Sequence, residues 1–450
     1  VYHFAHIGNL RSYIMEDVLE KSLRYVGYDV KRVMNITDVG HLSSDADTGE
    51  DKMLKGAKRE HKTVMEIAKY YTDAFFSDCK KLNIKTPDVV EPATNCIPEF
   101  IHMIEVLLEK GYAYVAGGNV YFDTSKLDDY YVFSSQSEKE LLVGVRDDVE
   151  EDVNKKNKND FVLWFTKSKF EDQALKWDSP WGVGYPGWHI ECSEMSKKYL
   201  GEQIDIHAGG EDLIFPHHEN EIAQSECAND KPFAAYWMHN GFLNIDNKKM
   251  SKSLGNFFTV RDIAEKYDLQ VLRFFMLSAH YRSPLNFSAE LMEASKNGLE
   301  RIMTCMDKLR ELKAKAQVGD MTAAETEKMA EADRLREKFE AAMEDDFNTA
   351  DAVSAVFELV KLANSTADAD STAAYVKGLE DLISRLCEVL GIITERKTEV
   401  LDEEIEAMIA ARQQARKEKN FALADEIRGK LLDMGIVLED TREGVKWKRA

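Results

Sequence analysis

The sequence contains few residues that interrupt regular structure and has no long apolar run. Among 450 residues there are only 8 prolines and 24 glycines, and apolar residues make up 44%. This composition excludes collagen-like, low-complexity and intrinsically disordered chains. No apolar run approaches the roughly 18 residues that a membrane span requires, and the first residues lack the basic head and apolar core of a signal peptide. We therefore expect a globular protein without a membrane span.

Cysteine is also scarce, and its spacing is wide. The six cysteines are Cys79, Cys96, Cys192, Cys227, Cys305 and Cys387. No two of them lie close enough in the sequence to indicate a compact metal motif or a disulfide framework. A reduced, cytoplasmic chain is therefore expected.

The net charge is strongly negative but unevenly distributed. The formal charge is −22, which disfavours indiscriminate binding to polyanions. The segment from Met408 to the end has 10 basic and 7 acidic residues, so the negative excess lies entirely before it. A mildly basic end on an acidic body is compatible with one localised nucleic-acid site, although solubility alone also explains the overall charge.

The order of predicted elements indicates an α/β fold followed by helical domains. Residues 1–39 indicate the end of a strand, a helix closed by Gly27 and a second strand from Asp29 to Ile36, which together begin a parallel sheet. The length suggests about three domains. We predict a Rossmann-type domain at 1–95 and 186–288, an inserted subdomain at 96–185, an all-α helical bundle at 289–395 and a small α+β domain at 396–450.

Turn residues and helix caps mark several further elements. A hairpin is expected to turn at Gly117-Gly118. A helix is expected to begin at Pro216, because proline is favoured in the first helical turn. In the tail, Asn420 and Gly435 are expected to cap the two ends of a helix that precedes a hairpin.

The first motif that indicates chemistry is His6-Ile7-Gly8-Asn9, at the predicted start of the first helix. Free backbone N–H groups and the helix dipole favour an anion there. Gly8 permits close approach of a ligand because it has no Cβ atom. The spacing of His6 and Asn9 puts both side chains on one face, where they can donate to phosphate oxygens. An ordinary helix start with a surface histidine is the alternative.

The second motif is Lys249-Met250-Ser251-Lys252-Ser253, in a loop after Phe242–Asp246. Two lysines beside serines suit a loop that closes over phosphates and stabilises the charge on departing pyrophosphate. A solvated lysine loop is the alternative. The presence of both motifs in one chain, about 240 residues apart, favours the functional interpretation.

A third set of residues has the chemistry of a metal site. His217 and Glu221 are spaced i, i+4 and share one face of the predicted helix, and Cys192 precedes them by 25 residues. A thiolate, an imidazole and a carboxylate together form a plausible zinc shell with an open position. His218 competes with His217 for this role. The alternative is a buried cysteine near a helix with two surface histidines.

The two phosphate motifs resemble the signatures of class I aminoacyl-tRNA synthetases, and the chain is most similar to the cysteinyl-tRNA synthetase family. Asn9 stands where many class I members have histidine. The resemblance implies a catalytic Rossmann-type domain and a C-terminal anticodon-binding domain. Its supporting stretches are VYHFAHIGN, NITDVGH, DFVLW, GWHIECSEM, GGEDLIFPHHENEIAQSE, KMSKSLGNF, YRSPLNFS, EDDFNTA and ALADEIRGKLLDMGIVLEDTREGVKWK.

In this family a zinc ion holds the substrate cysteine by its thiol. The resemblance implies that Cys192, His217 and Glu221 are three of its four ligands. The family's fourth ligand is a cysteine that would lie four positions upstream of Val1. We therefore expect the sequence to lack that ligand and most of the first strand.

The same resemblance assigns further site residues. Trp188 and His207 match the pocket for the substrate cysteine. ATP, with Mg²⁺, is expected to contact His6, Gly8, Asn9, Gly209, Gly210, Asp212, Lys249, Ser251 and Lys252. Of these, His6, Asn9, Lys249 and Lys252 are expected to be catalytic, because they hold the phosphates.

The implied reaction is the ATP-dependent activation of L-cysteine to cysteinyl-adenylate, with release of pyrophosphate, followed by transfer to tRNA(Cys). We expect Arg412, Arg416 and Arg428 to contact tRNA phosphates and Trp447 to stack on an unpaired base. A monomer is expected.

Two other functions remain open at this point. The cysteine ligase of mycothiol synthesis resembles this family closely but uses an amino-sugar acceptor and lacks the anticodon-binding end. A non-catalytic protein that binds tRNA or nucleotides is the alternative from another class. The basic tail disfavours the first alternative, and the intact phosphate motifs disfavour the second.

Overall fold

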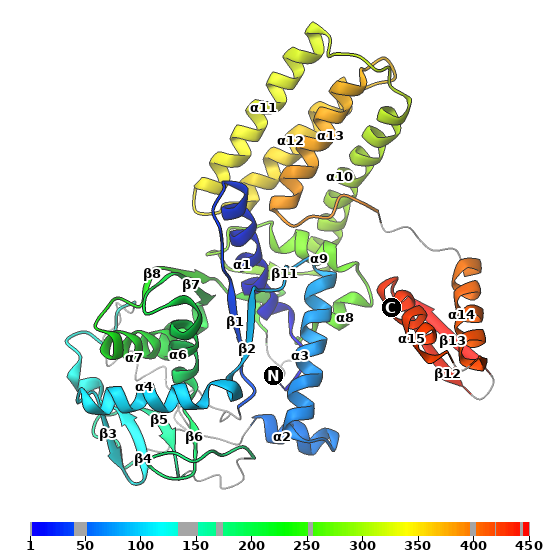
Figure 1. The fold of residues 1–450 in the computed structure, drawn as a ribbon. Coiled ribbons are helices and arrows are strands. Elements are labelled where there is room, and N and C mark those ends of the chain that lie inside the picture. The colour runs from blue at the N-terminus through cyan, green and yellow to red at the C-terminus, as the bar shows by residue number, and fades with distance from the viewer. Residues whose placement is uncertain are drawn as a thin grey trace. The chain divides into compact units, whose positions relative to one another are not determined.

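The computed structural model describes residues 2–39, 52–133, 152–167, 174–250, 255–396, 402–418, 420–441 and 444–449. Contacts divide the chain into two compact units, Val1–Ile393 and Thr394–Ala450. The first contains an α/β region and a group of long helices, and the second contains helices and a hairpin (Figure 1). This division does not separate the parts of the first unit, whose boundaries stay predictions. Among the described residues, no helix combines the length and the apolar character needed to cross a membrane.

The α/β region contains parallel strands whose connections include helices. Helix α1 (Ile7–Tyr25) precedes β1 (Val33–Ile36), which pairs in parallel with β2 (Val89–Pro92). A second parallel pair consists of β7 (Ile204–Gly210) and β8 (Ala234–Asn240). Within the described residues these are two separate sheets. Parallel strands require crossover connections, and helices supply them here.

Strand β1 is shorter than the predicted strand from Asp29 to Ile36. The carbonyl oxygen of Val30 accepts a hydrogen bond from the guanidinium of Arg24. The N–H group of Arg32 donates to a carboxylate oxygen of Asp88 over 2.9 Å. Side chains therefore satisfy these backbone groups in place of a neighbouring strand, so the strand begins only at Val33. Gly27 has a φ of +100° just after α1, as its predicted role at the helix end requires.

The inserted segment forms a small antiparallel sheet against a helix. The predicted turn is present, with φ values of +60° at Gly117 and +101° at Gly118. The core of this segment includes Phe100, Phe122 and Trp164, all fully buried. The helices α2 (Lys52–Glu60) and α3 (Val64–Lys81) precede this segment. Its elements are η1 (Ala93–Cys96), α4 (Ile97–Glu109), β3 (Ala113–Ala116), β4 (Asn119–Phe122), η2 (Thr124–Lys126), β5 (Phe161–Phe165) and β6 (Tyr185–Pro186), with sheet order β3-β4-β5-β6.

The helix expected to begin at Pro216 begins three residues later. Phe215 has extended dihedral angles (φ −126°, ψ 131°), which interrupt the helical path before Pro216. Regular α-helix starts at Glu219. The elements around this site are α6 (Trp188–Leu200), η3 (Glu211–Leu213), the π-helical turn η4 (Ile214–His218) and α7 (Glu219–Asn229).

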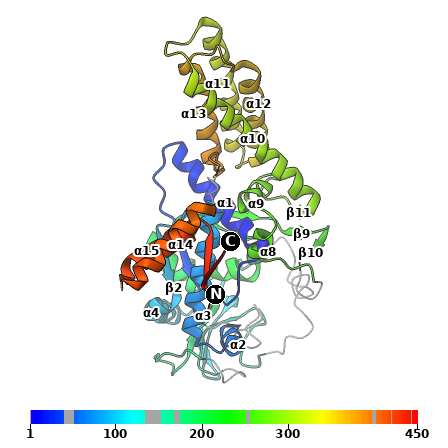
Figure 2. The same cartoon turned by 90° about the vertical axis from the view of Figure 1, so that its right-hand side faces the viewer.

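A three-stranded sheet lies beside the second phosphate motif. Its strands are β9 (Leu243–Ile245), β10 (Lys248–Lys249) and β11 (Leu285–Phe287), with β9 in the centre. Helices α8 (Val260–Ala264) and α9 (Leu269–Met276) follow the motif. Figure 2 shows this sheet close to α8.

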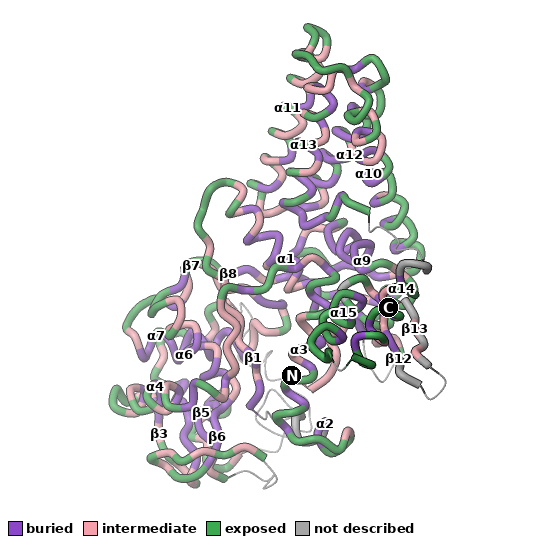
Figure 3. Tube along the Cα trace, turned by 45° about the vertical axis from the view of Figure 1, so that its right-hand side comes forward, coloured by how far each residue is buried: buried purple, intermediate pink, exposed green. Residues whose placement is uncertain are grey.

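The bundle consists of four helices, each of which begins at a capping side chain. They are α10 (Ala289–Lys315), α11 (Ala323–Glu344), α12 (Thr349–Thr366) and α13 (Ala373–Val389). Ser288, Thr322, Asn348 and Thr372 accept a hydrogen bond from the first turn of the helix that each precedes. In Figure 3 the inward faces of these helices are buried and their outer faces are exposed.

A fully buried arginine joins the bundle to the α/β region. Arg273 in α9 has no exposed surface. Its guanidinium donates to the carboxylate of Asp17 over 2.6 Å and to the carbonyl oxygen of Leu390 over 2.9 Å. It also donates to the carbonyl oxygens of Leu82 and Asn83. One side chain therefore links α1, α9 and the ends of α3 and α13.

Replacing Arg273 by methionine is expected to destabilise the fold by about 3–5 kcal/mol, because it leaves the Asp17 carboxylate buried without its main cation. Urea unfolding followed by circular dichroism would measure this change. The matched control is Arg336→Met, which removes an ion pair with Glu340 on the surface of α11 and should cost about 0.5 kcal/mol or less. Equal effects of the two substitutions would contradict the prediction.

The second unit folds around its own small core. Helices α14 (Asp402–Lys417) and α15 (Phe421–Asp433) pack with the hairpin of β12 (Ile436–Thr441) and β13 (Gly444–Arg449). The side chain of Asn420 accepts a hydrogen bond from the N–H group of Leu423, and Gly435 has a φ of +76°. Both predicted cap positions are therefore confirmed. The core residues are Ile405, Ile409, Ile427, Leu431, Ile436 and Leu438.

Candidate active site

The first motif caps the helix that it begins. His6 is the N-cap of α1, and its Nδ1 atom accepts a hydrogen bond from the N–H group of Asn9 over 3.2 Å. In return, Oδ1 of Asn9 accepts from the N–H group of His6 over 3.4 Å. In a neutral ring the proton then lies on Nε2, and the free end of the Asn9 amide is its NH₂ group. The reciprocal cap thus places two side chains with N–H donors at a helix N-terminus, where an anion is favoured.

Met250 of the second motif and the residues that follow the motif lie against the first motif. A Cβ atom on Gly8 would lie 3.1 Å from Cε of Met250 and 3.1 Å from Nδ1 of His6. After the motif, the N–H group of Ile7 donates to the carbonyl oxygen of Phe258 over 3.1 Å, and His6 forms a β-bridge with Thr259. Residues about 240 positions apart in the sequence therefore meet at the start of α1.

Only part of the second motif belongs to the described structure. The backbone of Lys249 pairs with Asn244 at the end of β10. Ser251 and Lys252 lie outside the described residues. Their predicted contacts with phosphate stay predictions.

The three predicted metal ligands lie together. The ligand atoms of Cys192, His217 and Glu221 are all within 4.8 Å of one another. Nε2 of His217 is 2.8 Å from Oε1 of Glu221. Both of these residues are buried, and Cys192 is half-buried. The structure thus places His217, and not His218, beside Cys192.

The chemistry of this cluster fits a cation. Glu221 Oε1 is buried and receives no hydrogen bond of acceptable geometry from the described residues. Nδ1 of His217 lies 2.8 Å from Nδ1 of His189. If His217 donates there, its Nε2 lone pair faces the cluster, as a histidine ligand requires. One sulfur, one nitrogen and one carboxylate oxygen form a donor set that zinc accepts.

Burial and charge act on the cluster in opposite directions. Burial raises the pKa of the Cys192 thiol well above its usual value, and the Glu221 and Glu191 carboxylates add to this. Burial also raises the pKa of the Glu221 carboxyl, but the His207 and His217 imidazoles outweigh it and hold that pKa well below its usual range. Without a cation the cluster therefore keeps its carboxylate charged and its thiol neutral.

Further histidines surround the cluster. Nε2 of His207 is 2.6 Å from Oε2 of Glu221, and Nδ1 of His218 is 2.8 Å from Nε2 of His239. His207, His218 and Glu221 form a second group whose ligand atoms lie within 4.8 Å of one another. Burial lowers the pKa of His218 to about 2 and that of His239 to about 4, so both rings are neutral. Sequence reasoning missed the positions of His189 and His239.

Both residues predicted for the cysteine pocket, and the glycine turn predicted for the nucleotide, also lie near this cluster. The ring of Trp188 stacks on His217 with centroids 4.2 Å apart. His207 belongs to β7, whose last residues are Gly209 and Gly210. A Cβ atom on Gly209 would lie 2.8 Å from Cε1 of His218, and one on Gly210 would overlap the carboxylate of Asp212. Side chains are therefore excluded from this turn.

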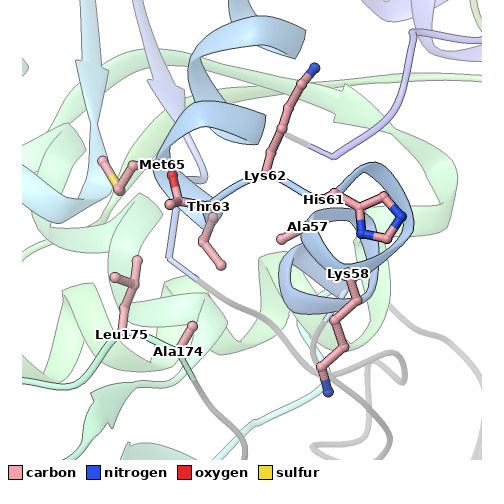
Figure 4. Close-up of a pocket in the computed structure, with 9 residues that line it drawn as sticks. Ala57, Lys58, His61, Lys62, Thr63, Met65, Ala174 and Leu175 are labelled. Carbon is pink, nitrogen blue, oxygen red and sulfur yellow. The ribbon is translucent and has the colours of Figure 1, made fainter.

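A separate cavity of about 590 Å³ lies between the α2–α3 corner and residues 174–175. The residues that line it include Lys58, His61 and Lys62, together with the apolar side chains of Met65 and Leu175. Figure 4 shows Lys58 and Lys62 extending away from each other, so their ammonium groups do not converge on one point. None of the predicted site residues lines this cavity.

Comparisons with known proteins agree along the whole chain. Residues 1–297 match the catalytic domain of class I (C) tRNA synthetases, residues 338–394 match a DALR domain, and residues 398–447 match the cysteinyl-tRNA ligase anticodon-binding domain. The cysteine–tRNA ligase of Lachnospira eligens is 54% identical over 455 residues, which cover 100% of this chain and 94% of that protein. The chain belongs to the cysteine–tRNA ligase family. The family member of Clostridioides difficile is 51% identical, with 100% and 93% of the two chains covered.

Solved structures share the fold of this family member at low identity. The methionyl-tRNA synthetase of Mycobacterium tuberculosis in complex with methionyl-adenylate has a TM-score of 0.58 at 17% identity, covering 86% of this chain and 87% of that one. A putative arginyl-tRNA synthetase of Campylobacter jejuni has a TM-score of 0.56 at 14% identity, covering 88% and 91%. These likenesses show the class I synthetase fold, which confirms the predicted fold class.

Family membership makes this chain a ligase and disfavours both alternative functions. The amino-sugar ligase lacks an anticodon-binding end, whereas residues 398–447 match that domain. The match over residues 1–297 is to a catalytic domain, which disfavours a protein that only binds tRNA or nucleotides.

The tail residues predicted to contact tRNA do not all lie on the surface of their unit. Arg412 is only 3% exposed, so its guanidinium is not available to phosphate and its predicted role is corrected. Arg416 and Arg428 are exposed. Trp447 is half-buried, packs against the core of the unit and donates from Nε1 to Glu406 over 2.6 Å. Sequence reasoning did not identify Phe421 as an exposed aromatic residue, and it is 61% exposed at the start of α15.

Proposed function

We propose that this enzyme activates L-cysteine with ATP and transfers it to tRNA(Cys). The observation that carries the proposal is the buried cluster of Cys192, His217 and Glu221, because a thiol-binding metal site explains a preference for cysteine. Both phosphate motifs and this cluster belong to the first unit of one chain, which supports action as a monomer.

In the first step, the donors at the start of α1 would bind the phosphates of ATP, with Mg²⁺ as the counterion. His6 can donate from Nε2 and Asn9 from its amide, while Gly8 lets the phosphate approach the helix N-terminus. Asn9 cannot carry a charge, unlike histidine, but its oxygen is fixed by the cap, so its NH₂ group is held ready to donate. Lys249 and Lys252 would stabilise the charge on the departing pyrophosphate.

The cluster would select cysteine. Cys192, His217 and Glu221 would hold Zn²⁺, which binds a soft thiolate far better than a neutral hydroxyl and so discriminates against serine. Trp188 stacks on His217 and would cover one side of the bound amino acid. Nδ1 of His189 lies 2.8 Å from Nδ1 of His217 and would orient the ring of His217. His207 and the turn of Gly209, Gly210 and Asp212 would place the amino acid beside the nucleotide.

Two assays test the proposed function. Exchange of labelled pyrophosphate into ATP should depend on cysteine, and total tRNA should become charged with labelled cysteine. Exchange without charging, combined with ligation of cysteine to an amino sugar, would overturn the proposed acceptor. Exchange that does not depend on cysteine would overturn the proposed amino acid.

The second unit would bind the anticodon end of the tRNA through exposed residues of α14 and α15. The stacking of one unpaired base on an aromatic ring contributes about 1–3 kcal/mol to the binding free energy. Phe421→Ala should therefore raise the KM for tRNA by about 10-fold or more and leave cysteine-dependent exchange unchanged. Leu432, also on α15, is likewise 61% exposed, and Leu432→Ala is the matched control. Equal KM values for the two variants would exclude stacking on Phe421.

A further inference from the structure

Arg11 in α1 is a buried arginine whose guanidinium, among the residues that the structure describes, donates to four backbone carbonyl groups. It is 3% exposed. Nη1 donates to the carbonyl oxygens of Gly241 and Phe242, each over 2.8 Å. Nη2 donates to the carbonyl oxygens of His280, over 3.1 Å, and Ser283. Burial lowers its pKa to about 10, so the side chain stays charged at pH 7.

The four carbonyl groups belong to two segments that support the second phosphate motif. Gly241 and Phe242 connect β8 to β9, and β9 pairs with β10, which ends at Lys249. His280 and Ser283 lie just before β11, which pairs with the other side of β9. Arg11 therefore holds the two segments that lead into β9 and β11, and β9 pairs with β10, where the lysine motif begins.

The same arginine lies on the helix that the first motif begins, two residues after Asn9. Asn9 and Arg11 belong to the first five residues of α1, so a helix that presents His6 and Asn9 also holds the base of β9. The far end of the second motif is held separately, because the N–H group of Val260 donates to the carbonyl oxygen of Ala5 over 3.0 Å. At the near end, Arg11 makes four hydrogen bonds from the first motif's own helix, and its neighbour Ser12 adds one to Asn240 over 2.7 Å.

We propose that Arg11 is a positioning residue for amino-acid activation, which sets the distance between the helix N-terminus that holds ATP and the strand that presents the lysine motif. This inference rests on the proposed function. Stabilising charge on a departing group requires donors placed to within a fraction of an ångström, and a misplacement of about 1 Å can cost on the order of 100-fold in rate. Arg11 would act through this placement without touching the substrate.

The test is to replace Arg11 by methionine, which keeps the length of the side chain and removes its donors. The kcat of cysteine-dependent pyrophosphate exchange should fall by about 10- to 100-fold. The zinc content and the KM for cysteine should not change, because the cluster lies on α6, η4 and α7. Transfer from preformed cysteinyl-adenylate to tRNA should stay within about twofold, since pyrophosphate has already left. Arg11→Lys should restore part of the rate, because an ammonium can reach some of the four carbonyl groups.

Arg24→Met is the matched control. It lies at the other end of α1, where the guanidinium bonds to Glu20 and to the carbonyl oxygen of Val30, and its exchange rate should equal that of the wild type. Gly241→Ala is an independent second variant. Its new Cβ would lie 2.7 Å from the carbonyl oxygen of Arg282, which forces apart the two segments that Arg11 joins. It should therefore show the same selective loss of exchange.

Three results would overturn the inference. They are wild-type exchange by Arg11→Met, an equal loss in Arg24→Met, and an equal loss of exchange and transfer in both Arg11→Met and Gly241→Ala. Each of these leaves the proposed function intact, provided that the wild-type enzyme still shows cysteine-dependent exchange.

Discussion

Replacing Cys192 by serine is expected to remove most of the bound zinc and to raise the KM for cysteine by about 100-fold or more. A hydroxyl is a much poorer zinc ligand than a thiolate, and loss even of residues that only support a metal ligand costs about 10- to 100-fold in metal affinity or activity. Without the metal the site can no longer distinguish a thiol from a hydroxyl. Metal analysis of the purified chain and steady-state pyrophosphate exchange would measure the two effects.

The matched control for this prediction is Cys227→Ser. Cys227 is a buried cysteine on α7, the helix that also carries Glu221. Its side chain lies outside both groups of possible metal ligands. Its substitution should leave the zinc content and the KM for cysteine unchanged. Wild-type zinc content in Cys192→Ser, or equal zinc loss in both variants, would remove Cys192 from the ligand set.

Replacing Gly8 by alanine is expected to lower the rate of exchange by about 100-fold. The new Cβ would lie 3.1 Å from both His6 Nδ1 and Met250 Cε, which is closer than side chains normally approach. The side chains of His6 and Met250 must give way by a few tenths of an ångström, and under the proposed function the same methyl group would stand in the path of the phosphate. The zinc content should not change, so metal analysis and exchange kinetics together separate this effect from damage to the cluster.

Gly429→Ala is the matched control for the substitution at Gly8. No atom lies within 4 Å of the Cβ position at Gly429 in α15. Alanine is favoured over glycine inside a helix by about 1 kcal/mol, so this variant should be slightly more stable and fully active in exchange. If Gly8→Ala exchanged as fast as Gly429→Ala, the close approach at Gly8 would have no role in activation.

The first motif shows what spacing can and cannot predict. The i, i+3 relation of His6 and Asn9 at a helix start was sufficient to predict that both side chains lie together. Their reciprocal cap was not predicted, because histidine is not among the residues favoured at the N-cap. The contact between Gly8 and Met250 was equally inaccessible, since it depends on how segments far apart in the sequence pack.

The sequence was sufficient to predict that Cys192, His217 and Glu221 lie together, but not what surrounds them. The i, i+4 spacing of His217 and Glu221 indicated a shared face, and the two side chains meet although regular helix begins only at Glu219. His189 and His239 come from α6 and β8, and nothing in their local sequence distinguishes a histidine that orients a ligand from one in an ordinary core. Only tertiary packing brings them to the cluster.

The C-terminal tail shows a different limit of prediction from the sequence. Counting charges identified a basic segment, but it could not say which face of α14 each arginine occupies. Arg412 lies on the buried face of its helix and Arg416 on an exposed one. The exposed ring of Phe421 was missed because apolar residues in an amphipathic helix are usually assigned to the core.

The reciprocal cap of α1 has a practical consequence for anyone who needs a folded but inactive enzyme. His6 and Asn9 begin the helix and also present its donors, so removing either side chain frays a central helix while it disables the site. Such a variant would not separate lost chemistry from lost structure, and crystals or tRNA-binding data obtained with it would be hard to interpret. A substitution at Lys252, which belongs to the second motif and not to α1, is the better choice for trapping substrates in an intact fold.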